Sequence, residues 1–276
     1  MTTLKLAIIQ FPRRLDDLKS NTELMAGYVA RLAADTTDTD VVLLPEGWLG
    51  PKLIPLAQYE GIMDQVFSRL KPLNCLLVSG AQYVIVDDQV FCRGLVLSQH
   101  LPKPVPFDKL FPSQAVGERS FVAPGTELPI FKHKGVSLGV ALCVDLFYPE
   151  VVRNLALRGV SLVLNPANIP RSRMALWQGL GVARACENTV FVAMANNTET
   201  SYADGRKIMG ESFVAYPDGQ KLVNFGREAG IFYLTLDLQL INRVRERWPY
   251  LEDVRTRTLT LDGRCAFRSL ANQIKN

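Results

Sequence analysis

A carboxylate, an amine and a thiol each follow a short apolar run in this chain, and together they could cleave an acyl bond. Glu46 comes after VVLLP, Cys143 ends the run VSLGVALC, and Lys109 lies in FDKLF, downstream of FCRGLVLS. Ligands of α/β proteins bind at the ends of strands, so these three side chains are predicted to share one pocket. A thiol supplies a nucleophile, a carboxylate a general base and an ammonium group an oxyanion partner. This set predicts a thiol hydrolase.

Cys143 is the candidate nucleophile because of its position. The apolar strand stops there, and a short loop leads to a helix that is predicted to begin at Pro149. Such a strand-to-helix elbow presents a side chain to a cleft and leaves main-chain N–H groups that can bind an oxyanion. The chain has five cysteines without C-x-x-C spacing, so neither a disulfide framework nor a zinc site is predicted. The other four cysteines do not lie at such a strand-to-helix elbow; they are Cys75, Cys92, Cys186 and Cys265.

Glu46 is the predicted general base, since the chain has only two histidines, His100 and His133. Both histidines are expected to be solvated in a loop or turn, which gives a Cys–His pair poor support. Glu46 follows a buried strand, and burial makes a carboxylate a stronger base, an effect that a neighbouring ammonium group such as Lys109 restrains. Phosphate-binding glycine loops are absent from the sequence, so a nucleotide does not account for Lys109.

Strand-like apolar runs alternate with helical periodicity along most of the chain. Strands are predicted at 4–9, 41–44, 76–78, 160–164 and 190–194. Helices are predicted at 24–32 after the capping candidates Asn21 and Thr22, and at 62–70, 149–159 and 177–188. Hairpins are predicted for 83–86 with 90–97 around Asp87 and Asp88, and beyond residue 211 around the turn 217–219. The pattern predicts one α/β domain of residues 1–276 with its helices outside the sheets.

Composition narrows the class of protein. The chain has 276 residues, 48% hydrophobic content and a net charge of +4, which are the values of an ordinary globular protein. Acidic residues interrupt the basic segment around Arg243, Arg245 and Arg247, so nucleic acid is not an expected partner. No membrane-spanning run or signal-peptide layout is present in the sequence, and a reducing cytoplasm is the expected location.

Six motifs in the expected order resemble the nitrilase superfamily, the carbon–nitrogen hydrolases. They are LLPEGWLG, FDKLFPSQAVGERSFVAPG, GVALCVDLFYPE, LVLNPANIP, ARACENTVFVAMANN and GESFVAYPDG. The resemblance implies a four-layer α-β-β-α sandwich that commonly pairs with a second subunit. It also implies the catalytic set Glu46, Lys109 and Cys143, with Glu118 as an auxiliary carboxylate. Without the motif, GER at Glu118 predicts only an exposed turn.

The resemblance also bears on the reaction and the pocket. The backbone N–H of Val144 is expected to share the oxyanion with Lys109. Val144 and Asp145 follow the cysteine where nitrile-hydrolysing members carry Trp and Glu, which favours amides. Phe147 replaces an arginine of many amidase-like members, which argues against a substrate carboxylate at that subsite. Pocket candidates, for which core packing is an equal alternative, are Phe147, Tyr148, Asn168 and Trp177.

The sequence therefore predicts a hydrolase that cleaves a small linear amide through a cysteine thioester and releases ammonia or an amine. A nitrilase or N-carbamoyl amide hydrolase with the same three groups is one alternative, and a catalytically silent binding protein is another. No metal and no cofactor are expected. The expected partners are a small-molecule amide and further copies of the chain in a homodimer or higher homo-oligomer, with Arg243–Tyr250 as a contact region.

Overall fold

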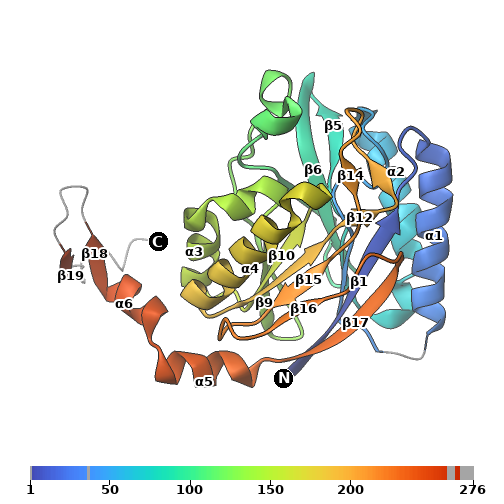
Figure 1. Ribbon diagram of the computed structural model, residues 1–276. Helices are drawn as coiled ribbons and strands as arrows, with labels where there is room; N and C mark the ends of the chain where they lie inside the picture. The colour runs from blue at the N-terminus through green and yellow to red at the C-terminus, as the bar shows by residue number, and fades with distance from the viewer. Residues whose placement is uncertain (1, 36–37, 260–264, 268–276) are drawn as a thin grey trace.

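Two β-sheets pack face to face, and two helices cover the outer face of each sheet (Figure 1). The coordinates are a computed structural model that describes residues 2–35, 38–259 and 265–267. The four layers are the helix pair α1 and α2, the first sheet, the second sheet, and the helix pair α3 and α4. The predicted α-β-β-α sandwich is confirmed. The predicted domain of residues 1–276 includes positions 260–264 and 268–276, which lie outside the described residues.

The first sheet is mixed and runs in the order β12-β1-β2-β4-β6-β5-β3, with β17 added to β1 and β7 added to β6. Its strands are β1 (Thr3–Pro12), β2 (Val41–Leu43), β3 (Ile54–Pro55), β4 (Leu76–Val78), β5 (Gln82–Val86), β6 (Gln89–Ser98), β7 (Val105–Asp108), β12 (Asn197–Thr198) and β17 (Gly230–Asp237). The helices α1 (Leu18–Ala34) and α2 (Leu56–Ser68) cover its outer face.

The second sheet runs in the order β16-β15-β11-β10-β9-β8. Its strands are β8 (Ile130–His133), β9 (Val136–Val140), β10 (Leu162–Pro166), β11 (Phe191–Ala195), β15 (Phe213–Ala215) and β16 (Leu222–Asn224). The helices α3 (Pro149–Leu157) and α4 (Met174–Asn188) cover it. Short 3₁₀ helices, which connect these elements, are η1 (Lys71–Leu73), η2 (Gln114–Val116), η3 (Glu118–Ser120), η4 (Cys143–Phe147) and η5 (Arg171–Arg173).

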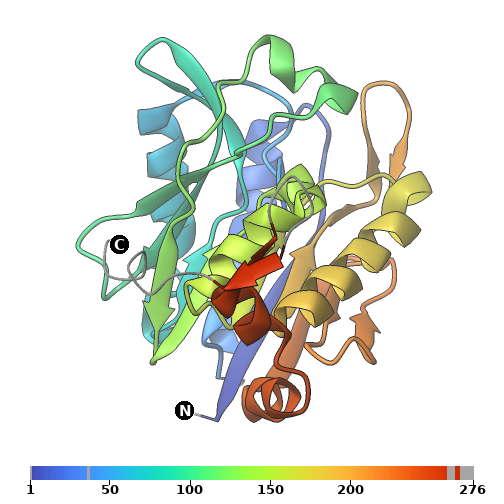
Figure 2. The ribbon, with the colours of Figure 1, turned by 90° about the vertical axis from the view of Figure 1, so that its left-hand side faces the viewer.

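The remaining elements are the small ribbon β13 (Thr200–Ser201) and β14 (Lys207–Ile208), and the C-terminal elements α5 (Gln239–Arg247), α6 (Tyr250–Thr256), β18 (Arg257–Leu259) and β19 (Cys265–Phe267). Figure 2 shows α6 in front of the α3 and α4 layer. Within the described ranges, no helix combines the length and apolar character needed to cross a membrane.

Alternation along the strands divides the interior into two apolar layers. In β1, Leu6 and Ile8 belong to the layer between the sheets, whereas Ala7 and Ile9 pack toward α1 and α2. The cause is the two-residue period of a strand, which sends neighbouring side chains to opposite faces. Burying one such Leu or Ile side chain contributes about 1.5–3 kcal/mol, so these layers hold the strand ends that carry the site.

The local structure agrees with most of the strands, helices and turns predicted from the sequence. It corrects two predictions, the cap of the first helix and the environment of His133. Asp87 and Asp88 have φ of 46° and 65°, as a two-residue hairpin turn requires, and the predicted β5–β6 hairpin is confirmed. The predicted cap of the first helix is wrong. Asp17 caps α1 by accepting the N–H of Ser20, and Asn21 instead lies inside the helix, where its amide bonds the main chain of Arg14.

The second correction concerns His133. It is 4% exposed at the end of β8, so the expectation of a solvated turn residue is wrong. The turn itself begins one residue later, at Lys134, which leaves His133 facing inward as the last strand residue. Burial lowers the pKa of this imidazole. His100 is exposed, as expected, and its Nε2 lies 2.6 Å from Asn74 Oδ1.

Candidate active site

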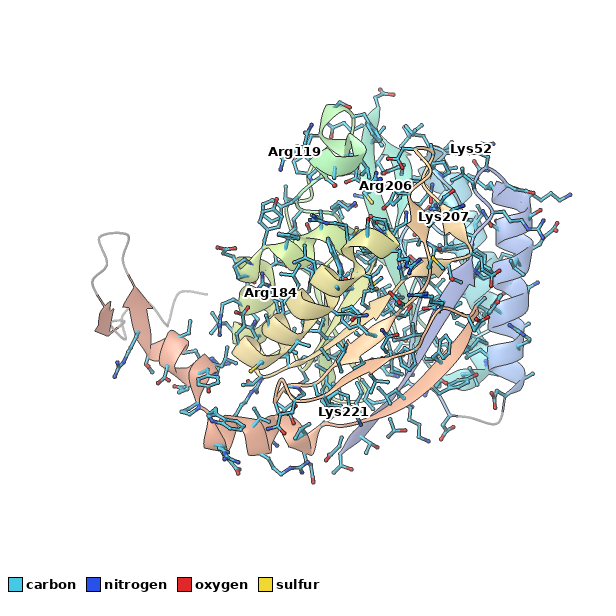
Figure 3. The ribbon with its side chains drawn as sticks, in the orientation of Figure 1. Lys52, Arg119, Arg184, Arg206, Lys207 and Lys221 are labelled. Carbon is cyan, nitrogen blue, oxygen red and sulfur yellow. The ribbon has the colours of Figure 1, made fainter. Side chains whose placement is uncertain are left out.

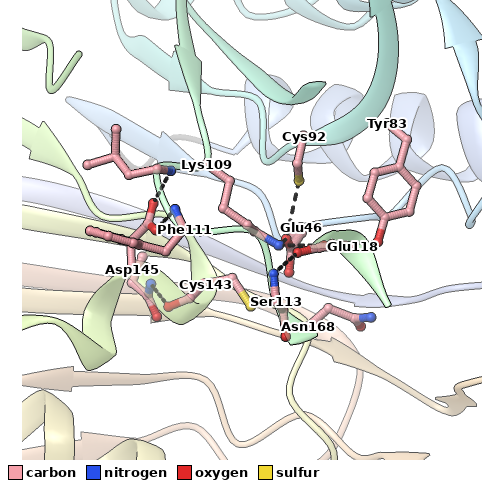
Figure 4. A network of polar contacts seen from close by, with 12 residues as sticks. Glu46, Tyr83, Cys92, Lys109, Phe111, Ser113, Glu118, Cys143, Asp145 and Asn168 are labelled. Carbon is pink, nitrogen blue, oxygen red and sulfur yellow. Dashed lines mark hydrogen bonds and ion pairs between the residues drawn. The ribbon is translucent and has the colours of Figure 1, made fainter. Parts of the chain in front are cut away.

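The structure brings together the four side chains that the sequence singled out for catalysis (Figure 4). Lys109 Nζ lies 2.6 Å from Glu46 Oε1 and 2.6 Å from Glu118 Oε1. Cys143 and Glu46 both line the same cavity, and the charge of the Glu46 carboxylate acts on the Cys143 thiol. All four residues are buried, and Lys109 and Glu118 are each only 1% exposed. A thiol, an ammonium group and two carboxylates therefore share one buried site.

Main-chain bonds to both sheets fix Glu46, which lies in the loop after β2. Its N–H donates to Ala167 O at 3.2 Å, just beyond β10 of the second sheet. Its carbonyl accepts Asn197 Nδ2 at 2.7 Å. The next residue, Gly47, donates its N–H to Ala81 O at 2.7 Å. The carboxylate therefore projects from a backbone that is anchored on each side of the sheet interface.

Lys109 follows β7 directly, and two sets of hydrogen bonds hold its segment. Its N–H donates to Cys92 O of β6 at 2.9 Å. The Asp145 carboxylate accepts the N–H groups of Leu110 and Phe111 at 3.0 and 2.9 Å. Burial raises the pKa of Asp145 to about 7, although these two bonds act in the opposite direction. Asp145 therefore joins the Lys109 segment to η4, the helix that begins with Cys143.

Cys143 occupies a strained elbow between β9 and η4. Its φ is +47°, a conformation that is uncommon for residues other than glycine and that often marks functional sites. Asn165 Nδ2 donates to Cys143 O at 3.1 Å and to Ala141 O, which fixes the backbone of the elbow. Burial and the Glu46 charge raise the pKa of Cys143 well above its usual value, against the opposing effect of Lys109. At neutral pH the sulfur is therefore a thiol that needs a base.

Glu118 is buried in η3, which corrects the exposed turn that GER alone predicts. Tyr83 Oη donates to its Oε1 at 2.9 Å, and the N–H of Ser113 donates to its Oε2 at 2.6 Å. With the ammonium group of Lys109, this carboxylate has three donors. The motif placed Glu118 near the amine, whereas residue polarity did not, because the burial of this turn depends on packing against Tyr83 of a distant strand.

The electrostatic balance of the site centres on Lys109. Burial by itself lowers the pKa of this amine, but the acidic groups packed around it, Glu46 and Glu118 among them, raise it well above its ordinary value. One ligand atom each of Glu46, Cys92 and Glu118 lie within 4.8 Å of one another, a spacing that suits a metal ion. The ammonium group already lies at 2.6 Å from both carboxylates, so this donor set fits Lys109 as its cation.

A cavity of about 630 Å³ opens onto these groups, a volume in the range of small-molecule sites. Besides the four catalytic candidates, four further predicted residues line it, namely Val144, Phe147, Asn168 and Trp177. The N–H of Val144 belongs to the first turn of η4, where helices leave N–H groups without intrahelical partners. The rings of Phe147 and Trp177 lie 5.7 Å apart and form one apolar wall.

Tyr148 does not line the cavity, in contrast to the prediction for this residue. Its ring stacks on Phe111 with a centroid distance of 3.7 Å and an interplanar angle of 19°. Phe111 belongs to the segment that Asp145 holds. The stacking therefore turns Tyr148 toward the Lys109 segment and away from the cavity.

Arginine side chains line part of the cavity. Arg13, Arg173 and Arg206 line it, and Lys52, Arg119 and Lys207 each follow a lining residue in the sequence. Figure 3 shows Lys52, Arg119, Arg206 and Lys207 in the upper part of the view, above Arg184 and Lys221. The buried Arg13 is committed to structure, since it donates to the carbonyls of Gly47 and Ser201 at 3.1 Å.

Sequence reasoning missed two polar residues of the site, Tyr83 and Cys92. Both lie on the β5–β6 hairpin, which the sequence predicted without a functional role. Cys92 lines the cavity and its Sγ lies 3.4 Å from Glu46 Oε1. The signal available was the strand alternation that places Cys92 and Val96 on one face of β6, but nothing local showed that this face meets Glu46.

Comparison with known proteins gives a consistent result. The family model described as carbon-nitrogen hydrolase matches residues 5–246. The chain is 28% identical over 227 residues to a 2-oxoglutaramate amidase of Bacillus subtilis (strain 168), covering 80% of this chain and 87% of that protein. It is 27% identical to an (R)-stereoselective amidase of Pseudomonas sp., covering 94% and 93%. In fold it resembles a CN-hydrolase superfamily protein of Xanthomonas campestris at 23% identity, with a TM-score of 0.81 over 94% of this chain and 100% of that chain.

Proposed function

Because the chain belongs to the carbon–nitrogen hydrolase family, in the amidase-like branch of the nitrilase superfamily, we propose that it hydrolyses small linear amides through a thioester on Cys143. One observation carries the proposal. The Lys109 ammonium group lies 2.6 Å from the Glu46 carboxylate, and both line one cavity with the buried Cys143 thiol. A base, a nucleophile and an oxyanion partner thus share one pocket before any substrate binds.

In the first step the Cys143 sulfur attacks the amide carbonyl carbon while its proton moves to Glu46. Burial keeps the thiol protonated at rest, so proton transfer accompanies attack. An S–C bond forms and the carbonyl oxygen becomes an oxyanion. The Lys109 ammonium group and the N–H of Val144 stabilise that negative charge.

In the second step the C–N bond breaks. The oxyanion collapses to a thioester, and protonated Glu46 gives its proton to the departing nitrogen, which leaves as ammonia or an amine. Water then attacks the thioester while Glu46 accepts one of its protons. The S–C bond breaks, the sulfur regains a proton, and the carboxylic acid leaves. Glu118 keeps the ammonium group of Lys109 in place through these steps, because the two lie 2.6 Å apart.

The test is ammonia release by wild-type protein and by Cys143→Ala over a panel of amides, nitriles and N-carbamoyl compounds. We expect amide turnover by the wild type and none by the variant, with unchanged far-UV circular dichroism. Intact mass spectrometry of wild-type protein quenched during turnover is expected to show the mass of one acyl group on Cys143. Full activity of Cys143→Ala would remove the assignment.

The same panel of substrates also shows which acyl group the protein accepts. Phe147 lines the cavity where many amidase-like members carry an arginine, while Arg173 and Arg206 line it elsewhere. The panel therefore pairs each neutral alkyl amide with an amide that bears a terminal carboxylate. A higher kcat/KM for the nitriles than for every amide would favour the nitrilase alternative with the same three groups.

A further inference from the structure

The two carboxylates that flank Lys109 receive different donors from one pair of strands. Tyr83 of β5 and Cys92 of β6 are register partners in the antiparallel hairpin. Tyr83 Oη donates to Glu118 at 2.9 Å, and Cys92 Sγ donates to Glu46 at 3.4 Å. Figure 4 shows both side chains reaching down from the hairpin toward the ammonium group between the carboxylates.

The donors differ in strength. Glu118 accepts a phenolic O–H, a main-chain N–H from Ser113 at 2.6 Å and the Lys109 ammonium group. Glu46 accepts the same ammonium group, but its other donor is the thiol of Cys92. An S–H group is a weak donor, and each hydrogen bond to a carboxylate favours its ionised form. Glu46 is therefore the carboxylate with fewer and weaker hydrogen-bond donors.

We propose that Cys92, together with its cross-strand partner Tyr83, is a positioning residue that assigns the two carboxylates to different tasks. Glu46, held by a weak donor, accepts and returns protons during the reaction. Glu118, held by strong donors, remains the ionised counter-ion of Lys109. The inference rests on the proposed amide hydrolysis and adds a residue to it.

Two further observations support this role for Cys92. The residue is 1% exposed, and burial raises the pKa of its thiol well above the usual value, so it keeps the proton that it donates. Its carbonyl also accepts the N–H of Lys109 at 2.9 Å. One residue of β6 thus fixes the side chain of the base and the backbone of the amine.

The pH dependence of Glu46 depends on every group that faces it. These titratable and charged groups are Arg13, Tyr83, Cys92, Lys109, Glu118, Cys143, Asp145 and Tyr202. A substitution at Cys92 that removes only its S–H donor leaves the charges of all the others unchanged. The variant therefore isolates one hydrogen bond to the base.

The experiment is the pH profile of kcat/KM for the best amide with wild-type protein, Cys92→Ala and Cys92→Ser. Loss of the donor in Cys92→Ala is expected to move the acidic limb about half a pH unit higher, the size of one weak hydrogen bond. Cys92→Ser keeps a donor and is expected to return the limb to the wild-type position or below it. Cys75→Ala, at a buried cysteine that does not line the cavity, is expected to leave the limb in place.

A second readout needs no turnover. The rate of Cys143 alkylation by iodoacetamide, followed by mass spectrometry against pH, depends on proton transfer to Glu46 and is expected to show the same displacement. An acidic limb that stays at the wild-type position in Cys92→Ala, by either readout, would overturn the role of Cys92. Absence of amide turnover by the wild type would instead contradict the proposed function, and the alkylation profile would still decide on Cys92.

Discussion

A single buried amine holds the active centre together. Lys109 is 1% exposed and its ammonium group lies 2.6 Å from each of two carboxylates. Two negative charges so close together in a buried site repel each other, and the ammonium group between them offsets the repulsion. The same group is available to the oxyanion of the proposed reaction. Its structural and chemical roles can be separated by substitution.

Lys109→Met is expected to lower both stability and turnover. Breaking a buried ion pair by removing one partner costs about 3–5 kcal/mol, because the remaining charge is left uncompensated. Loss of an oxyanion donor is expected to lower kcat by about 10²–10³-fold. Urea unfolding and ammonia release measure the two effects. A variant that keeps kcat within tenfold of the wild type would exclude Lys109 from the reaction.

The matched control is the double variant Lys109→Met with Glu118→Gln. It removes the ammonium group and one carboxylate charge together, so part of the lost free energy of unfolding is expected to return. Turnover is expected to stay low, because no cation stabilises the oxyanion. Recovery of turnover in the double variant would mean that the first effect was structural only.

At the scale of elements, the site depends on a contact between η4 and the segment after β7. Asp145 of η4 accepts the N–H groups of Leu110 and Phe111, and Phe111 stacks on Tyr148. The distance between the Cys143 elbow and Lys109 is therefore set by one carboxylate that bridges two loops. The strained backbone of Cys143, with φ of +47°, lies two residues from this bridge.

Asp145→Asn is expected to loosen this contact. The amide offers one acceptor oxygen in place of two, so one buried N–H group loses its partner at a cost of about 1–3 kcal/mol. We expect a lower kcat as well, since the Lys109 segment is no longer fixed to η4. Asp40→Asn is the control, because Asp40 is equally buried and accepts the N–H of Lys5 at 2.7 Å, far along β1 from the site. It is expected to lose stability and keep kcat.

The pH dependence of stability gives an independent check on Asp145. Burial raises its folded-state pKa to about 7 from 3.8. A raised pKa means that the fold favours the protonated form, so the contribution to stability is full below 3.8 and is lost as pH rises toward 7. The free energy of unfolding of the wild type, relative to Asp145→Asn, is expected to fall across this window. A difference that rises with pH would contradict the burial of this carboxyl group.

For the whole molecule, we propose that the chain forms one catalytic domain that associates with copies of itself. The site takes Lys109 from the first sheet and Cys143 from the second, so neither sheet carries it separately. The predicted contact region, Arg243–Tyr250, runs from the middle of α5 to the first residue of α6. Tyr250 is 43% exposed there, and Figure 1 shows α6 extending beyond the sandwich.

Light scattering after size-exclusion chromatography tests this arrangement. We expect a mass of two chains or more for the wild type and a shift toward one chain for Tyr250→Asp, since a charge in an apolar contact is costly to bury. Leu53→Asp is the control, because Leu53 is 47% exposed and lies outside this region. A wild type of single-chain mass at micromolar concentration would exclude the proposed contact.

Local order in the sequence was enough to predict sheets with helices outside them, most of their strands and helices, and three reactive groups, whereas the four layers came from the family resemblance. Apolar periodicity marks strands and helices directly, and Glu46 and Cys143 stand where apolar runs end. Glu118 was predicted only through its motif, because GER carries no local sign of burial. The ends of strands and the starts of helices can be predicted from the sequence because they depend mainly on residues that are neighbours in the chain.

Only the tertiary structure decided which distant side chains meet. Cys92 lies within 3.4 Å of Glu46 although 46 positions separate them, and His133 is buried although its neighbours in sequence are lysines. Tyr148 faces Phe111 instead of the cavity for the same reason. These contacts depend on how two sheets pack, and the energy of that packing is shared among many residues far apart in the chain.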